Sequence, residues 1–148
     1  MSEIRMIVNT KNAKETFELG VSMGEQAKPG QVYTLLGDLG VGKTLFTQGF
    51  AKGLGILEPV SSPTFTIVQI YKEGRIPFYH FDVYRIGDLE EMDEIGYEDY
   101  FYGNGVCMIE WADQIEEILP DDVIRIVLEK DLEQGFDYRK IMIGEEKA

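Results

Sequence analysis

Apolar residues recur at helical spacing in two segments of the chain. The first segment runs from Thr10 to Gln26, and either Asn12 or Thr10 is available to cap its start. The second covers residues 43–54, and Gly55 lies near its end. The pattern therefore predicts two helices. Their apolar faces carry Ala13, Phe17, Val21 and Gly24 in the first helix, and Leu45, Phe50 and Leu54 in the second.

Strand-like runs occupy most of the remaining sequence. Residues 32–36 are a short apolar run followed by glycine, which is typical of a buried strand. Residues 64–71 and 78–84 are rich in β-branched and aromatic side chains, and the polar segment 72–75 between them predicts a hairpin. Three further runs predict later strands, at residues 106–109, 123–128 and 138–143.

A short acidic helix is predicted between the hairpin and the later strands. Asp88 is followed three residues later by Glu91, which indicates a capping box for a helix that runs through Tyr100. Its apolar positions Leu89, Met92 and Ile95 are expected to face the core. Strands interleaved with helices predict a layered α/β fold, although the pattern does not give the order of the strands.

The phosphate-binding pattern G-x-x-x-x-G-K-[ST] lies between the first predicted strand and the second predicted helix. Glycines let the backbone turn several N–H groups toward one anion, and the following helix presents its positive end to that anion. The lysine reaches the β- and γ-phosphates, and the hydroxyl binds Mg²⁺. We therefore expect Gly37, Asp38, Leu39, Gly40, Val41, Gly42, Lys43 and Thr44 to bind a nucleotide.

This loop refines both the fold class and the ligand. We expect a three-layer P-loop NTPase domain over residues 1–148, with a mostly parallel central sheet and an antiparallel hairpin. Guanine-specific members of this class usually carry an Asn-Lys-x-Asp element. None occurs in this chain, so ATP with Mg²⁺ is the favoured ligand.

Composition constrains location and partners. The net charge of −13 argues against unaided binding to nucleic acid, and it suits either solubility or an acidic face for a basic partner. Cys107 is the sole cysteine, so no disulfide forms within the chain, as expected in a reducing cytoplasm. The N-terminus mixes Glu3, Arg5 and Asn9 with apolar residues, which fits neither a secretion signal nor a membrane span.

Two carboxylates, one within a strand-like run and one directly after such a run, are candidates for chemistry. Glu110 directly follows the run 106–109. It could hold Mg²⁺ directly or through water, or it could be an ordinary acid at the end of a strand. Asp82 shares a strand face with His80 and Tyr84, which indicates a site for hydrolysis, a solvated face or a structural pair with arginine. As the only histidine, His80 is expected to be a structural hydrogen-bonding residue rather than a metal ligand.

These segments together resemble one family, the bacterial TsaE (YjeE) proteins, over essentially the whole chain. Besides the loop at 37–44, the resemblance rests on Ser-Pro-Thr-Phe at 62–65, His-Phe-Asp-Val-Tyr-Arg at 80–85 and Ile-Glu-Trp at 109–111. The family often has proline after Glu-Trp, whereas this chain has Ala112.

The resemblance implies a cytoplasmic ATPase needed to make N6-threonylcarbamoyladenosine next to the anticodon of tRNAs that read codons beginning with A. It implies work with TsaB and TsaD, tRNA being reached through that complex, and no membrane association. It assigns Lys43 and Thr44 to phosphate and Mg²⁺, Glu110 to Mg²⁺, and Asp82 to hydrolysis. Lys43, Asp82 and Glu110 are thus the expected catalytic residues. Thr64 and Trp111 are expected to sense the nucleotide or face the partner.

Two other functions share the same loop. A small-molecule kinase usually brings several arginines onto the transferred phosphoryl group, but the five arginines here are scattered along the sequence. A nucleotide-dependent binding switch with negligible turnover overlaps the ATPase hypothesis, since few cations are available to speed hydrolysis.

Overall fold

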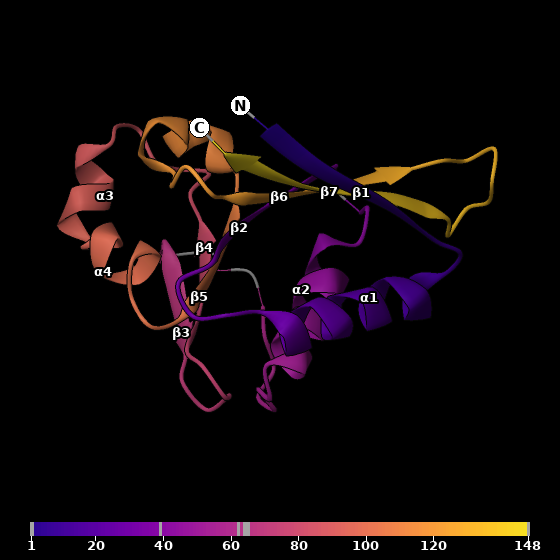
Figure 1. The fold of residues 1–148 in the computed structure, drawn as a ribbon, viewed down its shortest axis with the longest axis horizontal. Helices are drawn as coiled ribbons and strands as arrows, with labels where there is room; N and C mark the ends of the chain where they lie inside the picture. Colours follow the sequence, from indigo (N-terminus) through magenta and orange to yellow (C-terminus); the bar gives the residue numbers. More distant parts are fainter. Residues whose placement is uncertain (1, 39, 62, 64–65, 148) are drawn as a thin grey trace.

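A computed structural model describes residues 2–38, 40–61, 63 and 66–147, and an open seven-stranded sheet runs through it (Figure 1). The strands, in sheet order, are β1 (Ser2–Thr10), β7 (Arg139–Lys147), β6 (Ile124–Lys130), β2 (Val32–Gly37), β5 (Val106–Glu110), β4 (Phe78–Asp82) and β3 (Val68–Tyr71). The helices are α1 (Ala13–Gln26), α2 (Lys43–Gly53), α3 (Glu90–Glu94), α4 (Tyr97–Phe101) and the 3₁₀ helix η1 (Ala112–Ile118).

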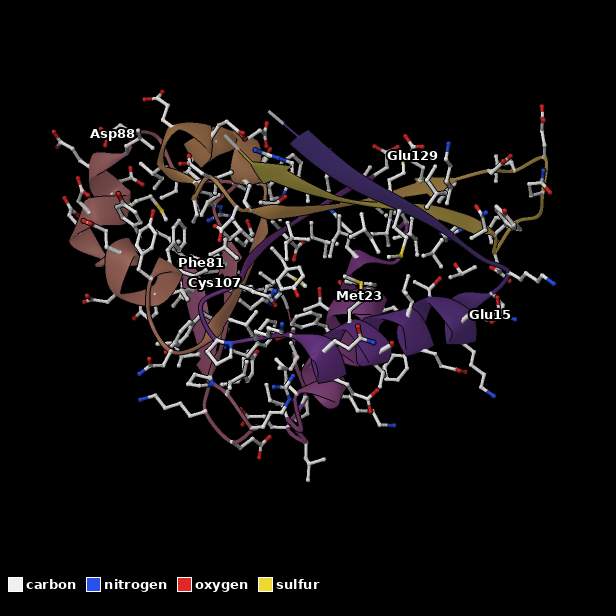
Figure 2. The ribbon with its side chains drawn as sticks, in the orientation of Figure 1. Glu15, Met23, Phe81, Asp88, Cys107 and Glu129 are labelled. Atoms are coloured by element: carbon white, nitrogen blue, oxygen red, sulfur yellow. The ribbon has the colours of Figure 1, made fainter. Side chains whose placement is uncertain are left out.

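Helices cover both faces of the sheet, so the fold has the three layers that were predicted. Alternate residues of β5 point to opposite faces: Val106 and Met108 join a core with α1 and α2, whereas Cys107 and Ile109 join a second core with α3, α4 and η1. Figure 2 shows Cys107 on the side of the sheet toward α3 and α4, and Met23 on α1 in the other layer.

The four strands at the centre of the sheet are parallel, and its edges are not. β6, β2, β5 and β4 run in the same direction, and β3 and β4 form the predicted hairpin. β7 pairs antiparallel with both β6 and β1. Among the described pairings half are therefore antiparallel, and the expectation of a mostly parallel sheet was wrong outside the centre. The connection 131–138 is too short for the crossover that a parallel β7 would need.

The N-terminal region differs most from the prediction. The predicted helix was extended back to Thr10, but Thr10 ends strand β1, which the sequence analysis missed. The helix begins at Ala13, and the Asn12 side chain accepts a 2.9 Å hydrogen bond from the backbone N–H of Glu15. Apolar and polar residues do not alternate regularly in β1, and its strand conformation comes from pairing with β7.

The acidic helix is broken into two. Gly96 has a φ of +73°, a left-handed conformation that separates α3 from α4 before Tyr100 is reached. The predicted core face is nevertheless correct, because Met92 is fully buried and Leu89 and Ile95 pack against the same core.

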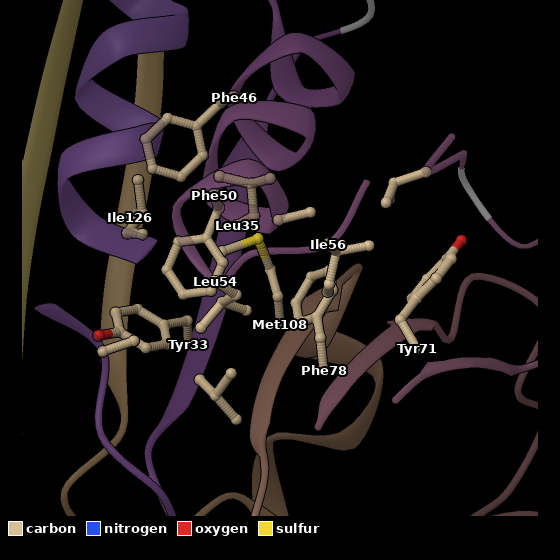
Figure 3. Close-up of a cluster of buried hydrophobic side chains, with 14 of the residues drawn as sticks. Tyr33, Leu35, Phe46, Phe50, Leu54, Ile56, Tyr71, Phe78, Met108 and Ile126 are labelled. Carbon is tan, nitrogen blue, oxygen red and sulfur yellow. The ribbon is translucent and has the colours of Figure 1, made fainter. Parts of the chain in front are cut away.

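Helix α2 is held by close packing on both of its sides. A Cβ atom on Gly24 of α1 would lie 2.1 Å from the Phe50 carbonyl oxygen, and one on Gly49 would lie 2.2 Å from that of Phe17. Only glycine permits this approach of the two backbones. On its other side α2 buries Phe46, Phe50 and Leu54 in the core (Figure 3). This packing fixes where the first turn of α2 lies relative to the sheet.

None of the helices in the described part of the chain has the length and apolar character needed to cross a bilayer.

Candidate functional site

A cavity of about 880 Å³ lies at the carboxyl ends of the parallel strands. Its described wall combines the ends of β2, β4, β5 and β6 with the glycine-rich loop 37–44 and the start of α2. The carboxyl edge of a parallel sheet is the usual place for a ligand in an α/β fold, because loops and helix N-termini meet there. Motifs that are far apart in the sequence therefore line the same cavity.

The glycine-rich loop has the backbone conformation that its sequence predicts. Gly40 and Gly42 have φ angles of +79° and +107°, in the left-handed region that favours glycine. Gly42 directly precedes α2, whose first turn has neither a capping side chain nor an acidic residue. The N–H groups of this turn are therefore not satisfied by a side-chain cap, and they form a favourable position for an anion.

Most residues of the predicted nucleotide site line this cavity. They are Gly37, Asp38, Gly40, Gly42, Lys43 and Thr44. Val41 differs, because it is 1% exposed and packs into the core beneath the loop. The side chain of Val41 therefore has a structural role in the core. Leu39 lies outside the described residues, so its assignment stays a prediction.

A side chain from β7, which lies between β1 and β6 in the sheet, supports the loop. Nε of Arg139 on β7 donates a 2.7 Å hydrogen bond to the Val41 carbonyl oxygen. The same guanidinium donates through Nη1 to the carbonyl oxygens of Phe136 and Tyr138, at 2.9 and 2.8 Å. Arg139 therefore ties the loop to the β6–β7 connection, a role that its position in the sequence did not indicate.

A cluster of polar and charged side chains lies at the cavity, and two of its members, Lys43 and Glu110, line the cavity wall. Lys43 Nζ lies 3.8 Å from Glu110 Oε1, and Glu110 Oε2 lies 2.9 Å from His80 Nε2. Glu110 is only 5% exposed and His80 only 1%. A carboxylate this deeply buried needs partners of this kind to remain ionised. The structure thus brings together Lys43 and Glu110, which the sequence had placed in separate motifs.

Asp82 lies beside Glu110 at the end of the neighbouring strand. The two residues are paired in the parallel register of β4 and β5, and both line the cavity. Asp82 Oδ1 also accepts a 3.0 Å hydrogen bond from the backbone N–H of Tyr84. No ion pair joins Asp82 to Arg85 within the described part of the chain, and Arg85 is exposed, away from the described cavity wall. These findings favour a role for Asp82 at the cavity over a structural pair.

Trp111 covers one side of Lys43. The centroid of the Trp111 ring lies 5.3 Å from Lys43 Nζ. Tyr84 also packs on the Trp111 ring, with 4.6 Å between the two ring centroids. Trp111 has a φ of +63°, and among the described residues it is the only non-glycine residue with a positive φ. This conformation costs about 1–2 kcal/mol, so the surroundings must hold Trp111 in place beside Glu110.

The remaining residues singled out in the sequence are the segment 62–65 and Cys107. Ser62, Thr64 and Phe65 lie outside the described residues, so a nucleotide-sensing role for this segment stays a prediction. Cys107 is fully buried, and burial raises the pKa of its thiol, so it packs as a small apolar core residue.

Sequence reasoning missed two polar residues that line the cavity, Gln48 and Glu129. Gln48 lies one helical turn after Thr44, so helical spacing could have indicated it. Glu129 lies near the end of β6, and placing it here required knowing that β6 is the neighbour of β2. In Figure 2 Glu129 lies toward the opposite end of the sheet from Phe81 on β4.

Comparison with known proteins gives the same family as the motifs. The family model described as "Threonylcarbamoyl adenosine biosynthesis protein TsaE" matches residues 10–141. The chain belongs to the TsaE family. A TsaE protein of Bacillus subtilis, named "tRNA threonylcarbamoyladenosine biosynthesis protein TsaE", is 50% identical over 132 residues, which cover 89% of this chain and 80% of the relative.

Other TsaE proteins extend the similarity in sequence and structure. The relative from Treponema pallidum carries the same name and is 42% identical over 119 residues. These residues cover 80% of this chain and 87% of the relative. The crystal structure of YdiB from Bacillus subtilis matches with a TM-score of 0.79 at 40% identity, and the match covers 99% of this chain and 88% of YdiB.

The contact between Arg139 and the loop leads to a first prediction. Arg139→Met removes charge-assisted hydrogen bonds to three carbonyl groups, so we expect the free energy of unfolding in urea to fall by about 1–3 kcal/mol. Because the loop loses its support at Val41, we also expect calorimetry to show about tenfold weaker ATP binding, which corresponds to one lost hydrogen bond of about 1.4 kcal/mol. The control is Lys140→Met, at the next position of β7. Equal stability and ATP affinity in the two variants would show that Arg139 does not support the loop.

Proposed function

We propose that this protein is a Mg²⁺-dependent ATPase that acts in the formation of N6-threonylcarbamoyladenosine next to the anticodon of tRNAs that read codons beginning with A. The ATPase activity is supported by one observation above all. The cavity brings together a helix N-terminus without a side-chain cap, the ammonium group of Lys43 and the carboxylate of Glu110. The pathway is supported by the names of the relatives in the family.

The cavity has the size of a nucleoside triphosphate site, and one side of it carries groups that bind phosphate. A volume of about 880 Å³ lies within the range of small-molecule sites. Phosphate oxygens would accept hydrogen bonds from the N–H groups of the glycine-rich loop and of the first turn of α2. Lys43 would turn from Glu110 to the β- and γ-phosphates, where its charge offsets theirs.

The donor groups beside the loop suit Mg²⁺. The hydroxyl of Thr44 and the carboxylate of Glu110 both line the cavity, and Mg²⁺ prefers such oxygen ligands, usually from few protein groups plus phosphates. When bound, Mg²⁺ would neutralise charge that develops on the phosphate oxygens. Asp82, on the neighbouring strand, would accept a hydrogen bond from the attacking water and so orient it.

The charges around the cavity favour an ATPase that depends on a partner. Of the described residues that line it, Lys43 is the only cation, whereas Asp38, Asp82, Glu110 and Glu129 are acidic. A small-molecule kinase needs several cations on the transferred phosphoryl group, so this lining disfavours that alternative. We infer that a TsaB–TsaD complex supplies the missing positive charge or orders residues around the nucleotide, and that this assembly makes contact with tRNA.

The two carboxylates carry the second prediction. Glu110→Gln and Asp82→Asn keep side-chain shape but remove a charge, so we expect ATP to bind while hydrolysis falls about ten- to a thousandfold. The matched control is Glu129→Gln, which removes a carboxylate from the same cavity and should leave hydrolysis near the wild-type rate. Steady-state turnover measured with partner proteins present checks all three variants. Unchanged turnover in both Glu110→Gln and Asp82→Asn would place the reacting groups elsewhere.

The third prediction concerns the partner. A missing cation on the phosphoryl oxygens costs on the order of a thousandfold in rate, so the isolated protein is expected to hydrolyse ATP slowly. Turnover should rise as a TsaB–TsaD complex is added. Binding to this complex should be tighter with ATP than with ADP, and it should weaken as salt increases because the chain has a net charge of −13. A turnover rate that is fast in isolation and flat with added partner would contradict this account.

A further inference from the structure

His80 is a polar residue in an apolar part of the core. It is 1% exposed on the face of β4 that packs toward α2, with Phe78 stacked nearly parallel to its ring at 5.9 Å. Within the described residues, His80 Nδ1 has no hydrogen-bond partner. A buried ring nitrogen without a partner is destabilising, so an apolar side chain would suit the core better. Packing alone therefore does not account for histidine at this position.

The other ring nitrogen faces Glu110. His80 Nε2 lies 2.9 Å from Glu110 Oε2, a contact buried on both sides. An ionised carboxylate only accepts hydrogen bonds, so the tautomer of His80 with its proton on Nε2 would donate this hydrogen bond to Glu110. His80 therefore holds one oxygen of Glu110, while the other oxygen, Oε1, lies 3.8 Å from Lys43 Nζ.

We propose that His80 is a positioning residue that fixes the carboxylate of Glu110 so that Oε1 faces the cavity as a ligand for Mg²⁺. This inference rests on the proposed function. In the structure Lys43 contacts Oε1, and a bound nucleotide would draw Lys43 away to its phosphates. Lys43 would then release Oε1, while His80 keeps its hold on Oε2. Carboxylates that ligate metals commonly depend on hydrogen bonds of this kind for their orientation.

The test compares two amides that carry their N–H groups at different distances from the backbone. The amide nitrogen of His80→Gln lies as many bonds from Cα as Nε2, whereas that of His80→Asn corresponds to Nδ1. ATP affinity is measured by calorimetry for each variant, first with EDTA and then with saturating Mg²⁺. The ratio of the two affinities isolates the contribution of the metal from folding and from phosphate binding.

We expect the Mg²⁺-dependent gain in ATP affinity to fall about tenfold or more in His80→Asn and in His80→Phe, with affinity in EDTA nearly unchanged. His80→Gln should keep most of the gain. The control is Phe81→Leu, a fully buried position on the opposite face of the same strand, which should lose stability but keep the full gain.

Two outcomes would overturn the role of His80. One is a wild-type gain from Mg²⁺ in His80→Asn, and the other is equal loss in His80→Gln and His80→Asn. If His80→Phe does not fold, the comparison of the two amides still decides the question. A wild-type protein that binds ATP equally well with EDTA and with Mg²⁺ would instead refute the proposed metal site, and the role of His80 with it.

Discussion

A buried carboxylate at the end of β5, one of the parallel strands of the sheet, constrains how the site is built. Glu110 is 5% exposed, and an ion at that depth costs several kcal/mol unless charged or hydrogen-bonding groups surround it. Here these groups include Lys43 from the start of α2 and His80 from the adjacent strand. Removing one partner of such a buried cluster typically costs about 3–5 kcal/mol. The position of α2 relative to β4 and β5 is therefore important for the stability of the site as well as its geometry.

Contacts elsewhere in the fold hold Lys43, Glu110 and His80 in their relative positions. The glycine contacts between α1 and α2 set the depth at which α2 lies against the sheet. Arg139 connects the loop before α2 to the antiparallel β6–β7 hairpin, whose second strand, β7, lies outside the parallel centre. Lys43 and Glu110 lie within ion-pair distance of each other. In the proposed function, a phosphate chain and a metal would replace that contact with two separate ones.

Much of the site could be predicted from the sequence because its motifs are local. The conformation of Gly40 and Gly42, the helix that begins at Lys43 and the strand that ends at Glu110 depend on neighbouring residues, and the structure confirms each of them. The contacts between motifs could not be predicted in this way. His80 and Glu110 are 30 residues apart, and Arg139 and Val41 are 98 apart. Such pairs depend on strand order, which hydrophobic periodicity does not encode. Strand β1 was missed for the same reason, since its partner β7 lies at the other end of the chain.

The central claim is that Lys43, at the start of α2, binds the phosphates of ATP in the cavity beside Glu110. Calorimetry of ATP with Mg²⁺ on Lys43→Ala tests it most directly, with Lys52→Ala as a control for loss of a lysine from the exposed side of the same helix. The account predicts that Lys43→Ala has no tight ATP binding and that Lys52→Ala binds as the wild type does. Wild-type affinity in Lys43→Ala would contradict it.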